Sequence, residues 1–386
     1  METSLRTIDS AGSCTHIVHV VRVGFAGGGM ENGIINVANR LPLNRYKISI
    51  CVLDHVETFS QHIQRENSEF YLVPPFSSGV DSTLVWRLAR LLQRSKADIV
   101  HSHNWGTFLY AIPAAKLTRV PIIHGEHGKN SMELDRESWP KRSAKSLLGP
   151  RVNRLVTVSR ALAAEWSDYG VPAGRILNIP NGVDVERFCP RPTNPEDRRK
   201  FGLPPEGFIF GSVGRLDSLK NYEVLISSFE RVTSEVPGSR LALLGDGPFK
   251  DRLKRKIDEL KLNDVVYLIG RRPDPENFLR ALDVFVLPSK YEGMSNVVLE
   301  AMATGLAVVC ADLPSHREVF EPDREGVVVS PFTAERLAEA LVDLARNRKR
   351  CRELGLAARE KVLHRFSLAR MVFDYEQLYA GFCRSR

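Results

Sequence analysis

The chain has 386 residues, 43% of them hydrophobic and 26% charged, with a formal net charge of +8. This length allows two α/β domains of about 150 to 200 residues each. The composition excludes a disordered or collagen-like chain. No apolar run approaches the roughly 18 residues that a transmembrane helix needs, so any membrane contact is expected to be peripheral. The positive charge favours an anionic partner, but it does not say which one.

The cysteines are scattered and form no CxxC pair. They are Cys14, Cys51, Cys189, Cys310, Cys351 and Cys383. This spacing predicts neither a zinc site nor a disulfide framework. It favours a reduced, cytoplasmic compartment.

In the first half of the chain, short apolar runs alternate with amphipathic stretches. The strand-like runs are residues 16–23, 46–53, 97–103, 120–127, 154–159 and 175–180, and helical patterns cover 31–41 and 81–95. Near-continuous Val, Ile and Leu strands separated by helices are typical of a parallel sheet covered on both faces. We therefore predict a doubly wound α/β domain.

A segment rich in Pro, Gly and charge, residues 180–207, interrupts this alternation and is the natural linker. A second series of strands follows at 208–216, 240–247, 264–270, 282–289, 306–312 and 326–330. The fold class predicted is therefore α/β, with two Rossmann-like domains that face a central cleft, where ligands bind beyond the carboxyl ends of strands. The helical tail could cross back, which gives domains of 1–185 plus 367–386 and of 186–366.

Two glycine-rich loops and one basic loop follow strands. Gly27, Gly28 and Gly29 precede a helix that Glu31 opens, where backbone N–H groups can meet an anion, although a ligand-free tight turn fits as well. The loop does not match GxGxxG, which weakens a dinucleotide oxidoreductase. In the second half, Arg215 and Lys220 share one loop and suit a diphosphate, whereas Gly245 and Gly247 form another turn.

The segment 287–309 is the most specific one. Glu292 lies in a loop after a buried strand, and Glu300 lies in the following helix among apolar neighbours. A poorly solvated carboxylate needs partners, which sugar hydroxyls can supply. The backbone of Gly293, Met294, Ser295 and Asn296 would offer N–H groups at the helix start. A capping Glu and a surface Glu are the plainer alternative.

Four histidines end two neighbouring strands of the first half. They belong to HSHNWG (101–106) and HGEHGKN (124–130). A structural role, a role in orienting substrate and a metal site all fit these residue types. Residues 139–160 carry six Lys and Arg and no acid, interleaved with Trp139, Leu147 and Leu148. They could form a basic membrane-surface patch or a solvated helix.

Taken together, these segments resemble glycosyltransferase family 4, a group of retaining GT-B transferases. The matching pieces are GGGMEN, HSHNWG, GEHG, IPNGVDVERF, GSVGRLDSLKN, GDGP, LIGRR and YEGMSNVVLEAMATG, in that order between residue 27 and about residue 305. EGMSN and GEHG look most like bacterial transferases of exopolysaccharide or surface-glycan synthesis, including those found with PEP-CTERM gene clusters.

The resemblance implies a role for each matching residue. Arg215 and Lys220 would hold the donor diphosphate, and Glu300 would bind the nucleotide ribose. Glu292 would lie by the donor sugar with residues 293–296, and His127 would face it from the first domain. Gly28 and Gly29 would line the phosphate side, Gly245 and Gly247 would lie nearby, and Arg272 would lie in the base-binding loop, where a small or apolar residue is more usual. The catalytic set would be His127, Glu292, Arg215 and Lys220.

The expected activity is metal-independent glycosyl transfer with retention, from a UDP- or GDP-sugar to a glycan or lipid-linked acceptor, with no cofactor. Such an enzyme would be cytoplasmic, with peripheral contact to the inner face of the plasma membrane through 139–160. A GT-B nucleotide-sugar epimerase and a non-catalytic nucleotide-sugar or glycan-binding protein remain alternatives. A nucleic-acid partner is not expected, because the basic residues are not interleaved with stacking aromatics.

Overall fold

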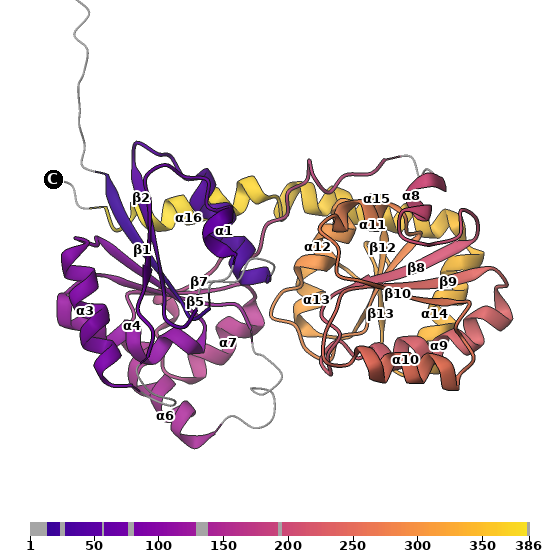
Figure 1. The fold of residues 1–386 in the computed structure, drawn as a ribbon, viewed down its shortest axis with the longest axis horizontal. Helices are drawn as coiled ribbons and strands as arrows, with labels where there is room; N and C mark the ends of the chain where they lie inside the picture. The colour runs from indigo at the N-terminus through magenta and orange to yellow at the C-terminus, as the bar shows by residue number, and fades with distance from the viewer. Residues whose placement is uncertain are drawn as a thin grey trace, which may run out of the picture.

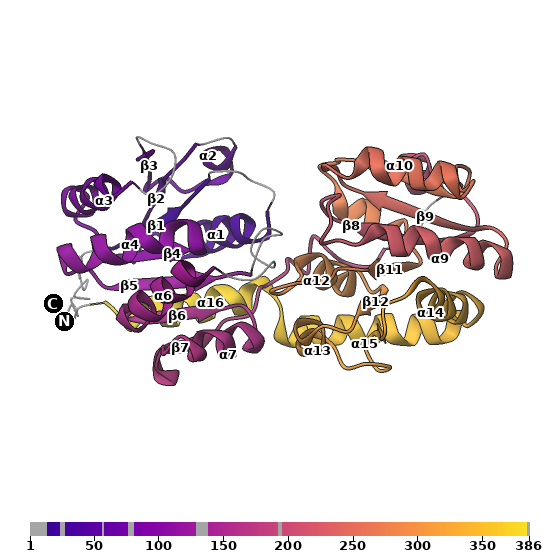
Figure 2. The same cartoon turned by 90° about the horizontal axis from the view of Figure 1, so that it is seen from below.

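The computed structural model describes residues 14–23, 28–55, 58–75, 81–128, 138–191 and 195–383. Within these residues the chain forms two parallel sheets, each with helices on both faces (Figures 1 and 2). The predicted α/β class with two Rossmann-like domains is therefore confirmed.

The first sheet has seven strands in the order β3-β2-β1-β4-β5-β6-β7. They are β1 (Thr15–Val21), β2 (Tyr46–Val52), β3 (Ser68–Leu72), β4 (Ile99–His103), β5 (Ile122–Glu126), β6 (Arg154–Thr157) and β7 (Ile176–Asn178). All of its pairings are parallel. The edge strand β3 was not predicted, because its sequence SEFYL mixes polar and apolar residues and the strand is only partly buried.

Two layers of helices cover the first sheet. The helices are α1 (Gly29–Arg40), α2 (Phe59–His62), α3 (Thr83–Arg94), α4 (Trp105–Thr118), α6 (Trp139–Leu148) and α7 (Arg160–Asp168), with short 3-10 turns at Gly149–Arg151 and Ala173–Arg175. Ile34 of α1 packs with Ile17 and Ile48 on one face. Leu88 of α3 and Phe108 of α4 pack in a second cluster on the other face.

The second sheet has six parallel strands in the order β10-β9-β8-β11-β12-β13. They are β8 (Phe208–Val213), β9 (Ser239–Leu244), β10 (Val266–Gly270), β11 (Val284–Leu287), β12 (Ala307–Ala311) and β13 (Val327–Val329). The helices are α8 (Pro195–Arg199), α9 (Tyr222–Glu235), α10 (Lys250–Glu259), α11 (Pro275–Arg280), α12 (Asn296–Ala303), α13 (Pro314–Val319), α14 (Ala334–Arg346) and α15 (Arg348–Arg365).

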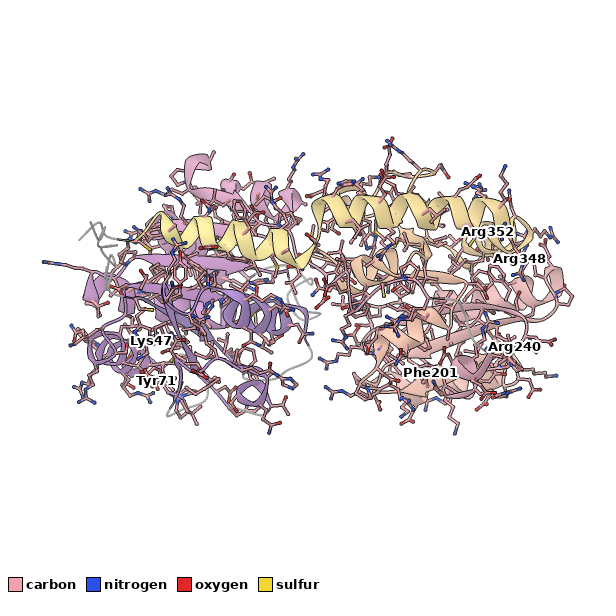
Figure 3. All side chains as sticks on the ribbon, turned by 90° about the horizontal axis from the view of Figure 1, so that it is seen from above. Lys47, Tyr71, Phe201, Arg240, Arg348 and Arg352 are labelled. Atoms are coloured by element: carbon pink, nitrogen blue, oxygen red, sulfur yellow. The ribbon has the colours of Figure 1, made fainter. Side chains whose placement is uncertain are left out.

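The two domains are joined by two side-by-side crossings of the chain. Val183 pairs with Ser367, its N–H donates to the carbonyl of Phe366, and its carbonyl accepts from the N–H of Leu368, both at 2.8 Å. Helix α16 (Leu368–Ala380) then packs on the first domain, where Leu368 and Tyr379 join the cluster of Ile17. The yellow helices α15 and α16 therefore run along both domains (Figure 3), as predicted for the C-terminal tail.

Each sheet reverses its strand order at one point. In the first sheet this point lies between β1 and β4, and in the second between β8 and β11. Loops beyond the carboxyl ends of strands at such a point form the binding crevice of doubly wound sheets. The loops that follow β5 and β11 lie against each other, because a Cβ built on Gly293 would be 2.3 Å from the carbonyl oxygen of His127. The carboxyl edges of the two sheets therefore face one junction.

Candidate active site

The second domain contributes an ion pair to this junction. Lys220 follows β8 and Glu292 follows β11, and their Nζ and Oε1 atoms lie 2.6 Å apart. The side chains are only 19% and 13% exposed, so water screens the pair poorly. The fold brings together two sequence-predicted residues that are 72 positions apart.

Burial and pairing oppose each other in this ion pair. Burial alone would lower the pKa of Lys220 and raise the pKa of Glu292. The opposite charge and the hydrogen bond between them outweigh burial, so the pKa of Lys220 is raised and that of Glu292 is lowered. Both groups are therefore charged at neutral pH.

Glu300 lies on α12 and lines an open cleft between the domains. Other residues of its wall come from α1, the linker and α16, among them Gly29, Asn181, Arg187 and Met371. Burial raises the pKa of Glu300 to about 8, and the nearby positive charge of Arg187 only partly opposes the shift. A half-buried carboxyl group that faces an open cleft can accept hydrogen bonds from polar ligand atoms, and when it is protonated it can also donate one to them.

The first domain supplies the facing wall. Gly29 opens α1, and its carbonyl accepts a hydrogen bond from Nδ2 of Asn296 at 3.2 Å. Gly28 lies one residue before it, and a Cβ there would be 2.1 Å from Oε2 of Glu31. A side chain at Gly128, whose φ is +122°, would approach the backbone of Gly293 within 3.3 Å. Glycines at 128 and 293 therefore allow the close approach of these two loops, whereas a side chain at 28 would meet only Glu31 of its own helix. Gly27 lies outside the described residues.

His127 follows β5 at this junction. Its backbone N–H donates to Oδ1 of Asn104 at 2.8 Å, and its Nε2 lies 3.1 Å from Nδ1 of His103. Burial lowers the pKa of His127 to about 4, so its imidazole is neutral at pH 7. The two histidine-bearing strands are neighbours as predicted, since His103 pairs with Gly125 in the β4–β5 register.

Strand alternation divides the histidines between the faces of the sheet. His101, His103 and His127 lie together with His19 of β1 around a small pocket. His124 points to the other face, where its ring packs against Phe108 and Trp166. Ring nitrogens of His19, His101 and His103 come within 4.8 Å of one another, a grouping that could hold a metal ion.

Other predicted donor-binding residues lie around the ion pair or farther out. Gly245 has a φ of +150°, and a Cβ there would be 1.9 Å from the carbonyl oxygen of Gly214. A Cβ on Gly247 would be 2.4 Å from the carbonyl oxygen of Leu216. These glycines thus pack the turn after β9 against the basic loop. The Arg215 side chain is 71% exposed and lies 3.8 Å from Asp217.

Arg272 follows β10, which β9 separates from β8 in the second sheet. Its guanidinium stacks on Phe201 at 5.1 Å and lies 3.2 Å from Asp274, and Figure 3 shows Phe201 within the second domain. Met294 and Ser295 instead lie at the junction. Asn181 donates its backbone N–H to Sδ of Met294, and the Ser295 hydroxyl is buried beside the start of α12.

Sequence reasoning missed two side chains of this junction and one hydrogen bond. Arg187 lines the cleft of Glu300 although it stands in the linker, and IPNGVDVERF was its only signal. His103 belongs to the predicted histidine cluster, but no spacing rule predicts its hydrogen bond to His127. Glu318 of α13 accepts the backbone N–H groups of Arg160 and Ala161 at 2.7 and 2.9 Å, which caps α7 of the other domain.

The basic segment 139–160 is not a uniform surface. Trp139 and Leu147 are 79% and 58% exposed at the two ends of α6. Lys145 is buried instead, with its ammonium 5.0 Å from the Trp166 ring centre and 4.9 Å from that of Tyr169. Of the helices described, none has the length and apolar character needed to cross a bilayer.

Comparisons with known proteins agree with this geometry. Residues 27–187 match Glycosyltransferase Family 4, and residues 193–361 match Glycosyl transferases group 1. The chain is 30% identical over 288 residues to WcaL of Escherichia coli K12, named as a colanic acid biosynthesis glycosyltransferase, which covers 70% of this chain and 68% of the relative. It is 29% identical over 305 residues to the E. coli UDP-Gal:alpha-D-GlcNAc-diphosphoundecaprenol alpha-1,3-galactosyltransferase, covering 76% and 77%.

Solved structures share the whole fold. HepE of Anabaena, determined in complex with UDP, superposes with a TM-score of 0.83 at 21% identity, covering 95% of this chain and all of that one. TarM superposes with a TM-score of 0.78 at 14% identity, covering 96% and 99%. Two facing Rossmann-like domains, the paired Lys220 and Glu292 at their junction, and these sequence matches lead to one conclusion: the chain belongs to glycosyltransferase family 4 and is a glycosyltransferase of the GT-B fold.

Proposed function

We propose that the protein transfers a sugar from a UDP- or GDP-sugar to a glycan or lipid-linked acceptor, with retention of configuration and without a metal ion. The observation that carries this proposal is the buried Lys220–Glu292 pair at the carboxyl edge of the second sheet. It lies where a doubly wound sheet binds its ligand, and it faces the loop of His127 across the junction.

The two domains divide the substrates in this proposal. Residues 186–366 bind the nucleotide sugar, and residues 1–185 with the helix of 367–386 bind the acceptor. Glu300 would accept hydrogen bonds from the ribose hydroxyls, because its carboxylate faces the cleft between α1 and α12. Binding would then give this poorly solvated group the hydrogen bonds that it needs.

Charge development explains the cations. As the bond between the anomeric carbon and the diphosphate oxygen breaks, negative charge grows on the leaving diphosphate. Lys220, joined by the exposed Arg215, would stabilise that charge in place of a divalent metal. The acceptor oxygen would attack the same face of the sugar, form the new bond to the anomeric carbon and pass its proton to the leaving phosphate oxygen.

Surface-polysaccharide synthesis is the pathway class that we propose. The support is the names of two relatives, one assigned to colanic acid biosynthesis and one to an undecaprenol-linked acceptor. An assay that combines UDP- and GDP-sugars with polyprenyl-diphosphate sugar acceptors tests the proposal. Formation of an elongated lipid-linked sugar supports it, and donor turnover to an epimer without any acceptor would identify an epimerase instead.

We also propose peripheral contact with an anionic membrane on the cytoplasmic side. The six free cysteines fit a reduced compartment. Exposed Trp139 and Leu147 flank Lys141 and Arg142 on α6, a combination suited to a headgroup surface. Flotation with vesicles of anionic lipid should recover the protein. The Trp139→Ser/Leu147→Ser variant should stay at the bottom of the gradient, and equal flotation of both proteins would refute this contact.

A further inference from the structure

A cluster of buried rings lies beneath His127. His19, His101 and His103 come from β1 and β4 and are each at most 3% exposed. Tyr375 and Tyr379 of the crossing helix α16 complete a small pocket that also touches His127. Only one member, His127, has a role implied by the family resemblance, which is to face the donor sugar from the first domain. The others need an explanation, because burying polar rings costs free energy unless their hydrogen bonds are satisfied.

Hydrogen bonds connect these rings in series. Nε2 of His127 lies 3.1 Å from Nδ1 of His103, and Nε2 of His103 lies 3.0 Å from Nδ1 of His19. Separately, Nδ1 of His101 lies 2.8 Å from the hydroxyl oxygen of Tyr379. Both ring nitrogens of His103 are thereby engaged. Among the fully buried ring nitrogens of this cluster, Nε2 of His19 and Nε2 of His101 have no partner in the described residues.

This use of the nitrogens argues against a metal centre. Structural and catalytic zinc sites take at least three protein ligands. Here the hydrogen-bonded series leaves two free ring nitrogens, and a third ligand would require one of its bonds to break. The series of hydrogen bonds is therefore the better account of the cluster.

Every ring in the series is neutral at pH 7. Burial lowers the pKa of His19 to about 3 and of His127 to about 4, and it holds the pKa of His101 and His103 well below the ordinary value. A neutral imidazole has one N–H donor and one acceptor nitrogen. In a series of such rings the tautomers are coupled. If one ring donates to its neighbour, the neighbour accepts on that nitrogen and carries its own proton on the other one.

Tyr379 determines the direction in which the hydrogen bonds of the series run. Its buried hydroxyl has the ring of His101 as its hydrogen-bond partner among the described residues, and a phenol can donate or accept. If Nδ1 of His101 donated, both the buried O–H of Tyr379 and the buried Nε2 of His101 would be left unsatisfied, whereas a donating hydroxyl leaves only the Nε2–H of His101 without a partner. We therefore take the hydroxyl as the donor, with Nδ1 of His101 accepting and Nε2 carrying the proton. A second unpaired N–H on Nε2 of His19 would place two buried donors in one small cluster. The favourable arrangement puts the His19 proton on Nδ1, from where it donates to His103, which in turn donates to Nε2 of His127.

We propose that Tyr379, His101, His19 and His103 are positioning residues that hold His127 with its proton on Nδ1, so that His127 meets the substrate as a hydrogen-bond donor. This inference rests on the proposed place of His127 at the donor sugar. It assigns the C-terminal crossing helix a part in the active site in addition to its packing. A fixed donor aimed at a sugar or phosphate oxygen stabilises charge without reorganising during the reaction.

The test compares two tyrosines of one helix. Tyr379→Phe removes the hydroxyl that bonds to His101. Tyr375→Phe is the matched control, because Tyr375 lies one turn earlier on α16 and lines the same pocket. Nitrogen-15 NMR of protein labelled at histidine reports which ring nitrogen of His127 carries the proton. We expect Nδ1 in the wild type and in Tyr375→Phe, and a mixture of both tautomers in Tyr379→Phe.

Activity gives the second readout. Tyr379→Phe should lower kcat about fivefold, the effect of weakening one neutral hydrogen bond, whereas Tyr375→Phe should stay within about twofold of the wild type. A wild-type His127 protonated on Nε2 overturns the inference, and this measurement needs no variant to fold. An unchanged tautomer in folded Tyr379→Phe also overturns it. Because the NMR readout needs no donor sugar, absent transfer by the wild type would count against the proposed function alone.

Discussion

The two walls of the junction use different chemistry. The second domain presents formal charges, with Lys220 and Glu292 paired at 2.6 Å. The first domain presents neutral imidazoles, because burial suppresses the protonation of His127 and His103. The difference fits the two halves of glycosyl transfer. Fixed cations suit the departing diphosphate, and oriented neutral donors suit sugar oxygens whose charge changes less.

The largest effect is expected on the charged wall. Lys220→Ala should lower kcat roughly 100- to 1000-fold, the range for losing one preorganised electrostatic group. The variant should fold, although Glu292 is left without its partner. Lys254→Ala, at an exposed position of α10, is the matched control. Steady-state rates with a saturating donor measure the effect, and full turnover by Lys220→Ala would refute the diphosphate role.

A variant of Glu300 tests whether this residue of the second domain binds the ribose of the donor. At pH 9, where Glu300 is ionised, Glu300→Gln should weaken donor binding about tenfold, because hydrogen bonds to a charged acceptor are the stronger ones. Titration calorimetry with the nucleoside diphosphate measures this loss. Glu353→Gln on the exposed side of α15 should bind as the wild type does. Unchanged affinity in Glu300→Gln would place the ribose elsewhere.

The raised pKa of Glu300 also predicts a pH dependence of stability. The pKa of Glu300 is about 8 in the folded protein against an ordinary value of 4.5. Between pH 4.5 and pH 8 the folded state therefore keeps a proton on Glu300 that the unfolded state has lost. Wild-type stability should therefore fall relative to Glu300→Gln as the pH rises from about 4.5 to 8. The variant should be more stable by about 2 kcal/mol at pH 9, since partial solvation reduces the full linkage. Urea unfolding at pH 5, 7 and 9 measures the difference, and a pH-independent difference would contradict it.

The smallest effect concerns how the walls are held together. Glu318 caps α7 of the opposite domain through two backbone N–H groups. Glu318→Ala should lower kcat/KM about threefold, consistent with the loss of about 0.7 kcal/mol expected for a helix cap. The exposed Glu321, which pairs with Arg324 of its own domain, provides the control variant Glu321→Ala. Equal kcat/KM values of the two variants would contradict a contribution of Glu318 to the contact between the domains.

The sequence predicted the domains better than it predicted the contacts between them. Strands such as Phe208–Val213 and Val284–Leu287 are short, apolar and followed by glycine or proline, so local pattern sufficed to find them. The half-exposed edge strand Ser68–Leu72 carries no such pattern and was missed. The motifs identified Lys220 and Glu292 as separate candidates. Their pairing could not be predicted in this way, because it depends on β8 and β11 being neighbours in the sheet.

The histidines show the same limit. Strand alternation separates His124 from His101 and His103, and the register of β4 and β5 shows why. The bonds to His19 and Tyr379 join positions 84 and 278 residues apart, which no local pattern encodes. The exposed Arg215 and the stacked Arg272 likewise depend on loop conformations that composition does not fix.

The central claim is that the junction binds a nucleotide sugar through Lys220. Thermal unfolding of the wild type with a panel of UDP-, GDP- and ADP-sugars tests it most directly. A donor at about 100 times its Kd stabilises the fold by about 2.7 kcal/mol, so we predict that one class of nucleotide raises Tm by a few degrees. The same nucleotide should leave the Tm of Lys220→Ala unchanged. An equal shift in both proteins, or no shift with any nucleotide sugar, would contradict the account.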